Sequence, residues 1–189
     1  RLEHHHRVNT KEIIDHYYPA GTPLRDIYLR HCRSVADLAL EINASRGLGI
    51  DPKVVEDAAM LHDIGICLTD APSIGCHGDL PYILHGVAGA DILRIEDADE
   101  QYARVAESHT GSGLTRDEIE AAKLPIPSGR DAMPRTMLEK LICYADKFYS
   151  KSGDMQRKSV ESVEREIRRH GQAALDRFIE LKELFGDVQ

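Results

Sequence analysis

The chain has 189 residues, of which 42% are hydrophobic, and this suits a single domain with one core. Its 24 basic and 32 acidic side chains give a net charge of −8 without a dense basic run, which argues against stable binding of nucleic acid. No segment reaches the roughly 18 consecutive apolar residues of a membrane span, and no signal peptide opens the chain, so we expect a cytoplasmic protein.

Histidine is frequent, with ten residues in this acidic chain. His4–His6 resemble an affinity segment, so we assign residues 1–9 to a tag or a disordered start and residues 10–189 to one domain. The four cysteines are scattered and form no Cys-x-x-Cys pair, which predicts reduced thiols on buried faces.

The hydrophobic periodicity is helical almost throughout, and no segment alternates apolar and polar residues over the length of a strand, which predicts an all-α fold. A short helix is predicted around residues 11–14, and a longer one begins near Pro23. On the longer helix His31 shares an apolar stripe with Val35 and Leu38, so we expect it to face the core.

The next predicted helix opens at residues 51–52 and carries His62 on its inner face, with Asp63 beside it. Residues 69–81 are expected to form a loop across a surface or the mouth of a site. The helical pattern resumes at residue 83, where His85 shares a face with small residues, and a further stripe ends in His109.

Residues 115–118 have the pattern of a capping box that starts a short helix. After a second loop, residues 124–134, the following helix carries an apolar face with Asp146 at its inner edge. The charged, amphipathic residues 154–186 predict C-terminal helices with a solvated outer face, and a homodimer through them is left open.

Four histidines and two aspartates are thus expected on inward helical faces: His31, His62, Asp63, His85, His109 and Asp146. A buried imidazole needs partners for both ring nitrogens, and a buried carboxylate needs compensation of several kcal/mol, which divalent ions supply. Imidazole with carboxylate suits iron, manganese, zinc, nickel or cobalt rather than a thiolate zinc site. Because six ligands exceed what one tetrahedral ion uses, we expect two ions, with Asp63 placed to bridge them.

These residues resemble the HD-domain superfamily of metal-dependent phosphohydrolases, whose helical core carries a histidine, a His-Asp pair and a distant aspartate. The matching segments are residues 30–36, 59–65 and 144–147, and the resemblance covers about residues 24–150. The histidine segments between them resemble the subset that binds two metals. The resemblance implies two ligand groups: His31, His62, Asp63 and Asp146 for the first ion, and Asp63, His85 and His109 for the second.

The most similar branch is that of the bacterial symmetrical dinucleoside-tetraphosphate hydrolases, which have a similar length and a similar histidine-glycine segment. That branch usually has a lysine shortly after its His-Asp pair, where this sequence reads Gly65-Ile66-Cys67-Leu68. Lys147 is expected to supply a phosphate-facing cation instead, and Thr110 a further donor to the substrate.

The resemblance implies a hydrolase that cleaves a phosphoester or phosphoanhydride of a nucleotide or another small phosphorylated metabolite. Two ions that share Asp63, iron in the first place, would lower the pKa of a water between them and so generate the attacking hydroxide. Asp63 and Lys147 are therefore the predicted catalytic residues, and Thr110 and Lys147 the predicted substrate contacts. Two alternatives stay open: a mixed-valent di-iron oxygenase with the same ligands, and a non-catalytic signalling domain of the same fold. The role of His77, in the loop at 69–81, is also open.

Overall fold

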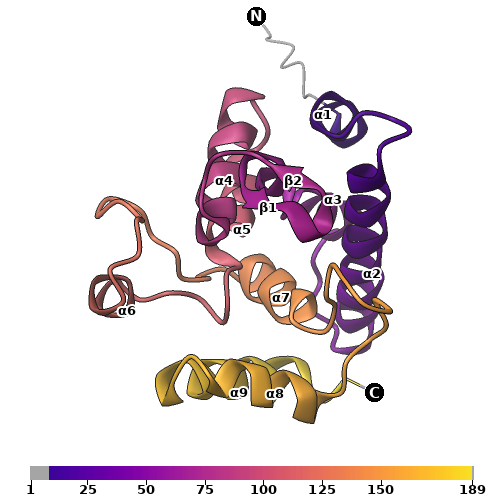
Figure 1. The fold of residues 1–189 in the computed structure, drawn as a ribbon. Helices are drawn as coiled ribbons and strands as arrows, with labels where there is room; N and C mark the ends of the chain where they lie inside the picture. Colours follow the sequence, from indigo (N-terminus) through magenta and orange to yellow (C-terminus); the bar gives the residue numbers. More distant parts are fainter. Residues whose placement is uncertain (1–8, 189) are drawn as a thin grey trace, which may run out of the picture.

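The computed structural model describes residues 9–188, whose regular secondary structure is helical apart from one short hairpin (Figure 1). The α-helices are α1 (Thr10–Tyr17), α2 (Pro23–Ser45), α3 (Pro52–Leu61), α4 (His85–Ile95), α5 (Glu100–Ser108), α6 (Arg116–Ala121), α7 (Met137–Asp146), α8 (Val160–Arg168) and α9 (Gln172–Phe185). The predicted all-α class is confirmed. The predicted affinity segment lies outside the described residues.

Helix starts coincide with the capping side chains that the sequence carries. Thr22 caps α2, and Pro23 follows as its first residue, where a missing N–H costs nothing. Thr115 and Glu118 form the expected capping box at the start of α6, each side chain accepting a hydrogen bond from the backbone N–H of the other residue.

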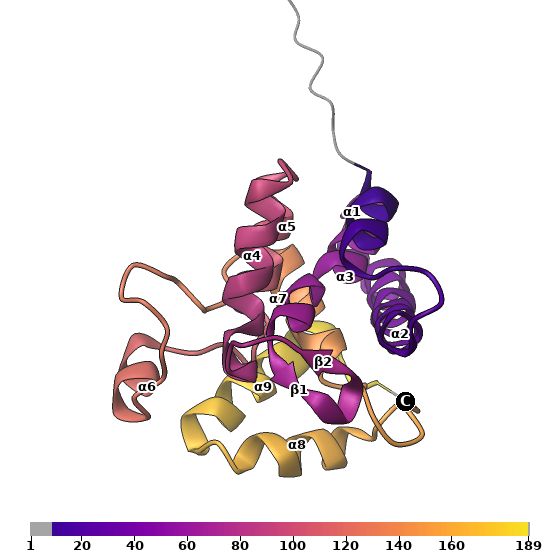
Figure 2. The same ribbon diagram turned by 45° about the horizontal axis from the view of Figure 1, so that its top comes forward.

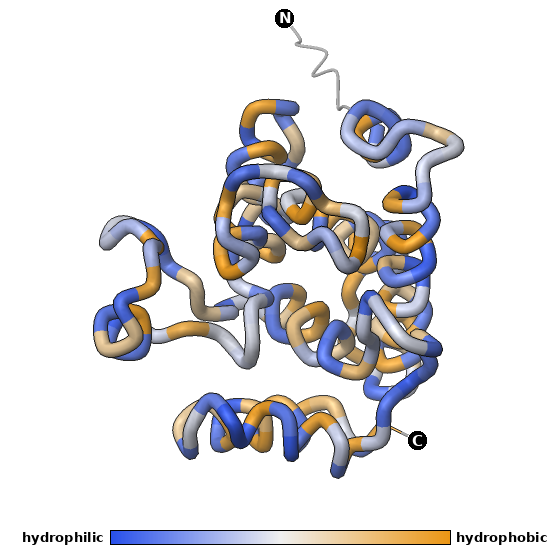
Figure 3. The backbone as a smooth tube through the Cα atoms, viewed as in Figure 1, coloured by the Kyte–Doolittle hydropathy of each residue, from blue (hydrophilic) through white to orange (hydrophobic). Residues whose placement is uncertain are grey.

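Helix α7 lies in the middle of the molecule and contacts α2, α3, α5 and α9 (Figures 1 and 2). The pair α2 and α3 packs on one side of it, and the pair α4 and α5 on the other. Tyr144 of α7 stacks on Phe178 of α9 with ring centroids 5.3 Å apart, which anchors the C-terminal helices. Apolar residues follow the inward sides of these helices in Figure 3, so the core surrounds α7.

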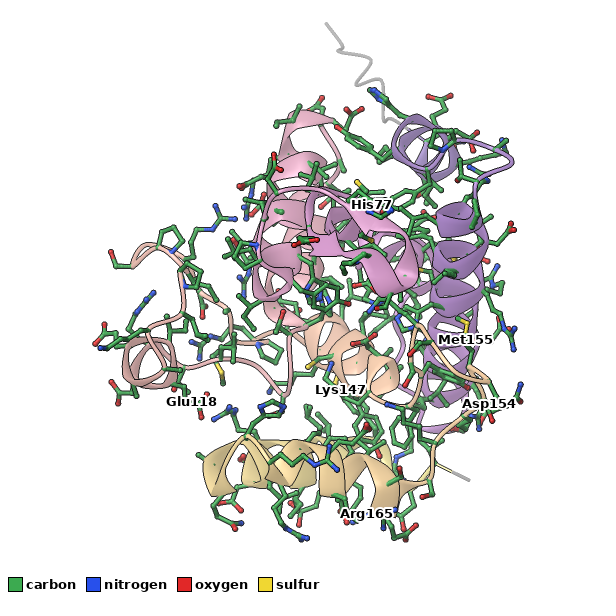
Figure 4. All side chains as sticks on the ribbon, viewed as in Figure 1. His77, Glu118, Lys147, Asp154, Met155 and Arg165 are labelled. Atoms are coloured by element: carbon green, nitrogen blue, oxygen red, sulfur yellow. The ribbon has the colours of Figure 1, made fainter. Side chains whose placement is uncertain are left out.

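The segment predicted as a loop at residues 69–81 contains a small antiparallel hairpin, β1 (Asp70–Ala71) and β2 (Cys76–His77). Two-residue strands are too short to show an alternating pattern in the sequence. His77 pairs with Asp70 in this hairpin, and its side chain is exposed. Figure 4 shows it on the hairpin, away from Lys147 at the C-terminal end of α7.

Gly65 permits a close approach that positions α4. It lies in a 3₁₀ turn, Ile64–Leu68, directly after the His-Asp pair. A Cβ atom at Gly65 would collide with the backbone oxygen of His85 and the backbone nitrogen of Gly89. The absence of a side chain here therefore lets the start of α4 approach Asp63.

No helix within residues 9–188 combines the length and the apolar character that a membrane crossing requires.

Candidate metal centre

All six predicted ligands meet at the centre of the fold, beside the C-terminal end of α7. One ligand atom from each residue lies within 4.8 Å of the others in each of two groups, which share Asp63: His31, His62, Asp63 and Asp146, and Asp63, His85 and His109. Asp146 is partly exposed and the other five side chains are buried. The structure thus brings together every residue that the sequence pattern selected as a metal ligand.

Each ligand comes from a helix at a defined place. His31 lies in the middle of α2, whereas His62 and Asp63 follow the end of α3. His85 is the first residue of α4, and His109 caps the end of α5. Asp146 is the last residue of α7. Adjacent residues within a helix point in different directions, so both could not face one cluster from the middle of a helix. His62 and Asp63 follow the end of α3, where the backbone leaves the helix and both side chains can point to the same cluster.

Three of the imidazoles are fixed in the same way by the backbone. The Nδ1 atoms of His62, His85 and His109 lie 2.6, 2.6 and 2.7 Å from the carbonyl oxygens three residues before them. Because a carbonyl oxygen only accepts, each Nδ1 donates its proton, and in the neutral form that binds a metal each Nε2 then presents its lone pair to the cluster. A neutral imidazole oriented by such a bond is the usual form of a metal ligand.

These lone pairs face other acceptors. His85 Nε2 lies 3.0 Å from His109 Nε2, and His62 Nε2 lies 3.1 Å from Asp146 Oδ1. His31 Nδ1 and both carboxylate oxygens of Asp63 are buried without an aligned hydrogen bond. Facing acceptors repel each other unless a cation lies between them, so the donor set fits divalent ions.

The pKa values describe a cluster that attracts positive charge. Burial raises the pKa of the Asp63 carboxyl, but the Lys151 ammonium and the His62 imidazole outweigh it and hold this pKa well below its usual range. Burial opposes the charged form of His62 too, yet the Asp63 carboxylate raises the pKa of His62 well above its usual range. Burial and the neighbouring His109 lower the pKa of His85 to about 3, which keeps His85 neutral at pH 7.

The side chains of two lysines, one at the end of α7 and one in the loop that follows, contact the cluster. Lys147, which the sequence predicted, donates to the backbone oxygen of His109 at 2.7 Å and to Asp146 Oδ2 at 2.8 Å. Lys151, which sequence reasoning missed, places its Nζ 2.9 Å from Asp63 Oδ2 and 5.5 Å from the centre of the Tyr82 ring. Lys151 lies in the loop after α7, where no periodic pattern relates it to the ligands, so the sequence carried no signal for it.

The cluster opens into a cavity of about 1150 Å³. His85, His109 and Asp146 lie in its wall, together with both lysines. Thr110, predicted to contact substrate, lies in the same wall next to His109. The cavity continues between α6 and the pair α8 and α9, with His170 at an exposed position in the lining. His16 and His77 do not line it, and His16 instead lies 3.6 Å from Glu96.

A second set of charges supports the helix that carries His109. The buried carboxylate of Glu107 accepts hydrogen bonds from Arg94, Arg104 and Arg130, at distances of 2.8 to 3.3 Å. These arginines come from α4, α5 and the loop before α7. The network therefore joins three segments around the end of α5 and fixes the backbone that presents His109.

Comparisons with known proteins agree with this geometry. The HD-domain family model matches residues 28–150. An uncharacterized protein of Methanocaldococcus jannaschii is 37% identical over 121 residues, which are 62% of this chain and 63% of that protein. No solved structure matches the chain.

Two further relatives carry the name tRNA (cytidine(56)-2'-O)-methyltransferase. The protein of Picrophilus torridus is 32% identical over 66% of this chain and 32% of its own length. That of Thermoplasma volcanium is 29% identical over 93% of this chain and 46% of its own length. The chain thus spans between 32% and 63% of the length of these three relatives. The family match covers the segment from α2 to the end of α7 and so includes all six clustered ligands. The chain therefore belongs to the HD-domain family.

Proposed function

We propose that this protein is a metal-dependent phosphohydrolase that cleaves a phosphoester or phosphoanhydride of a nucleotide or another small phosphorylated metabolite. The observation that supports it most strongly is the pair of ligand groups that share Asp63 at one end of a cavity lined by two lysines. Membership of the HD-domain family agrees with this chemistry.

In this proposal Asp63 is the ligand common to two ions. His31, His62 and Asp146 complete the first group, and His85 and His109 complete the second. Imidazole and carboxylate ligands suit iron in the first place, and also manganese, zinc, nickel or cobalt. When bound, such a pair of ions supplies positive charge for the phosphoryl oxygens and a water that is acidic enough to attack at neutral pH.

The side chains around the ligands orient the phosphoryl group. Lys147 is held by the backbone oxygen of His109 and by Asp146, so its charge lies at a fixed point of the cavity wall. Lys151 lines the same end of the cavity and can turn from Asp63 towards a phosphoryl oxygen by rotation of its flexible stem. Thr110 offers a hydroxyl beside them. Fixed donors that point at developing negative charge lower the barrier to phosphoryl transfer.

Hydrolysis accounts for this chain better than the methyl transfer named in two relatives. The segments that match this chain are 32% and 46% of those proteins, so their names describe chains with a large additional part. The features that support hydrolysis all lie between His31 and Lys151.

A paired assay tests the proposal. Protein without the histidines at positions 4–6 is loaded with iron or manganese and tested for phosphate release from a panel of phosphoesters and nucleotides. Asp63→Ala should abolish release, whereas Asp37→Ala, at an exposed position on α2, should leave it unchanged. Oxygen uptake coupled to product, without phosphate release, would contradict hydrolysis and support the di-iron oxygenase alternative.

A further inference from the structure

The far end of the cavity is lined both by residues within the HD-domain match and by residues beyond it. That match ends at residue 150, whereas α8 and α9 begin later in the chain. Val163, Ile167 and Ala174 of these helices line the cavity opposite Ala121 and Leu124 of the α6 segment. These five side chains form an apolar strip in the wall farthest from the metal ligands, and the helices that follow the family core supply one side of it. Charged and polar residues in and beside the same helices border the strip: Glu118, Lys158, Glu166, His170 and Arg177.

The charged residues at this far end are already paired with one another. Arg177 of α9 donates to both carboxylate oxygens of Glu118 at 2.8 and 2.9 Å, and Lys158 lies 2.8 Å from a carboxylate oxygen of Glu166. Arg177 also donates to the backbone oxygens of residues 112 and 113, so four of its five N–H groups are already bonded. A second phosphate here would meet two carboxylates and cations that are already neutralised.

Bound metal ions would concentrate positive charge at the other end instead, because they would take over the carboxylates of Asp63 and Asp146 that Lys151 and Lys147 now contact. The volume of about 1150 Å³ is far larger than a phosphate group and lies just above the usual range for ligand pockets, about 300–1,000 Å³. The cavity thus has one end suited to a single anionic group and a long remainder suited to an uncharged group.

We propose that the cavity selects a phosphomonoester with a bulky, uncharged and largely apolar organic group, and that the wall formed by α6, α8 and α9 determines this specificity. The inference rests on the proposed function, because the phosphate is placed at the metal ligands. It favours aromatic phosphomonoesters over small polar ones and over dinucleoside polyphosphates, whose additional charges the far end does not match.

Ala121 provides a direct test because it is exposed, lines the far wall and lies at the end of α6. Ala121→Asp places a charge in the apolar wall, and Lys123→Asn makes the same change in net charge at an exposed residue outside the lining. Lys123 has a positive φ of 54°, a conformation that asparagine tolerates. The two variants therefore separate an effect on the wall from an effect of overall charge.

The kinetic experiment compares 1-naphthyl phosphate, glycerol phosphate and a dinucleoside tetraphosphate as substrates. We expect kcat/KM to be highest for 1-naphthyl phosphate, and Ala121→Asp to lower it about tenfold through KM while kcat for glycerol phosphate is unchanged. Lys123→Asn should behave as the wild type. Equal kcat/KM for naphthyl and glycerol phosphates, or preference for the tetraphosphate, would overturn the inference and leave hydrolysis intact.

If none of the compounds is hydrolysed, that result counts against the proposed function alone. A binding experiment then still tests the specificity of the cavity. Calorimetry with manganese-loaded protein compares naphthylmethylphosphonate with methylphosphonate, neither of which can release phosphate. Tighter binding of the naphthyl compound, reduced about tenfold by Ala121→Asp and not by Lys123→Asn, would support the inference. Equal affinity for the two phosphonates would overturn it.

Discussion

Glu107→Gln should destabilise the protein strongly because it removes the one charge that three arginines share. The Glu107 side chain is 5% exposed, whereas those of Arg94, Arg104 and Arg130 are 36%, 19% and 22% exposed. Removing one partner of a buried ion pair costs about 3–5 kcal/mol, and because the arginines retain access to water we expect the lower value, about 3 kcal/mol. At about 2–4 °C per kcal/mol for a chain of this size, Tm should fall by roughly 6–12 °C.

The pH dependence provides a second measurement of the same effect. Burial raises the pKa of Glu107, but hydrogen bonds from Arg94 and Arg104 outweigh it, so the folded pKa is below the unfolded one. The stabilisation is then fully present above the unfolded pKa of about 4.3 and is lost as the pH falls through the folded value. The difference in stability between the wild type and Glu107→Gln should therefore shrink in acid.

Urea and thermal unfolding between about pH 2.5 and pH 7 measure both effects, because this range extends below the unfolded pKa of Glu107. Chelator is present so that metal binding does not contribute. Glu100→Gln is the matched control, because Glu100 also pairs with Arg94 but its side chain is 62% exposed. Its cost should be about 1 kcal/mol or less. A Glu107→Gln protein no less stable than Glu100→Gln, or a difference that grows in acid, would refute the reasoning.

Two further changes test the site and its support. Lys151→Met should lower phosphate release about 100-fold, because it removes a donor to the phosphoryl group. Metal content should stay unchanged, because Lys151 is not one of the ligands. Loss of metal together with activity would contradict this prediction. Gly65→Ala should destabilise the fold by about 3 kcal/mol in urea unfolding because its Cβ would collide with the backbone of α4, whereas Gly129→Ala, with open space around it, should change stability little. Equal stability of these two glycine variants would show that the close approach of α4 is not required.

The ligand cluster could be predicted because helical periodicity carries the necessary information. His31 lies on an apolar stripe whose direction is determined by the period of the helix, and Asp146 lies at the inner edge of a similar stripe. Pro23 and the capping box at Thr115 and Glu118 placed two helix starts, because proline suits a first helical position and the box satisfies N–H groups of a first turn. The all-α class followed from these local rules, and the family from the resemblance of the segments that carry the ligands.

The remaining features depend on contacts that have no local pattern. Lys151 lies in a loop, so nothing in its neighbourhood in the sequence directs it to Asp63, about 90 residues earlier. The cavity arises from the placement of α6 against α8 and α9, a tertiary arrangement that amphipathic patterns do not specify. Lys147 was expected to face phosphate, and its bonds to the His109 backbone and Asp146 became apparent only from the folded chain.

The central claim is that one carboxylate, Asp63, belongs to two metal sites at once. Elemental analysis of the metal content tests it most directly. The protein used lacks the histidines at positions 4–6, because that segment could bind metal by itself. We predict about two divalent ions per chain for the wild type, about one for His85→Ala and close to none for Asp63→Ala. An Asp63→Ala protein that keeps one ion and its phosphate release would contradict the account.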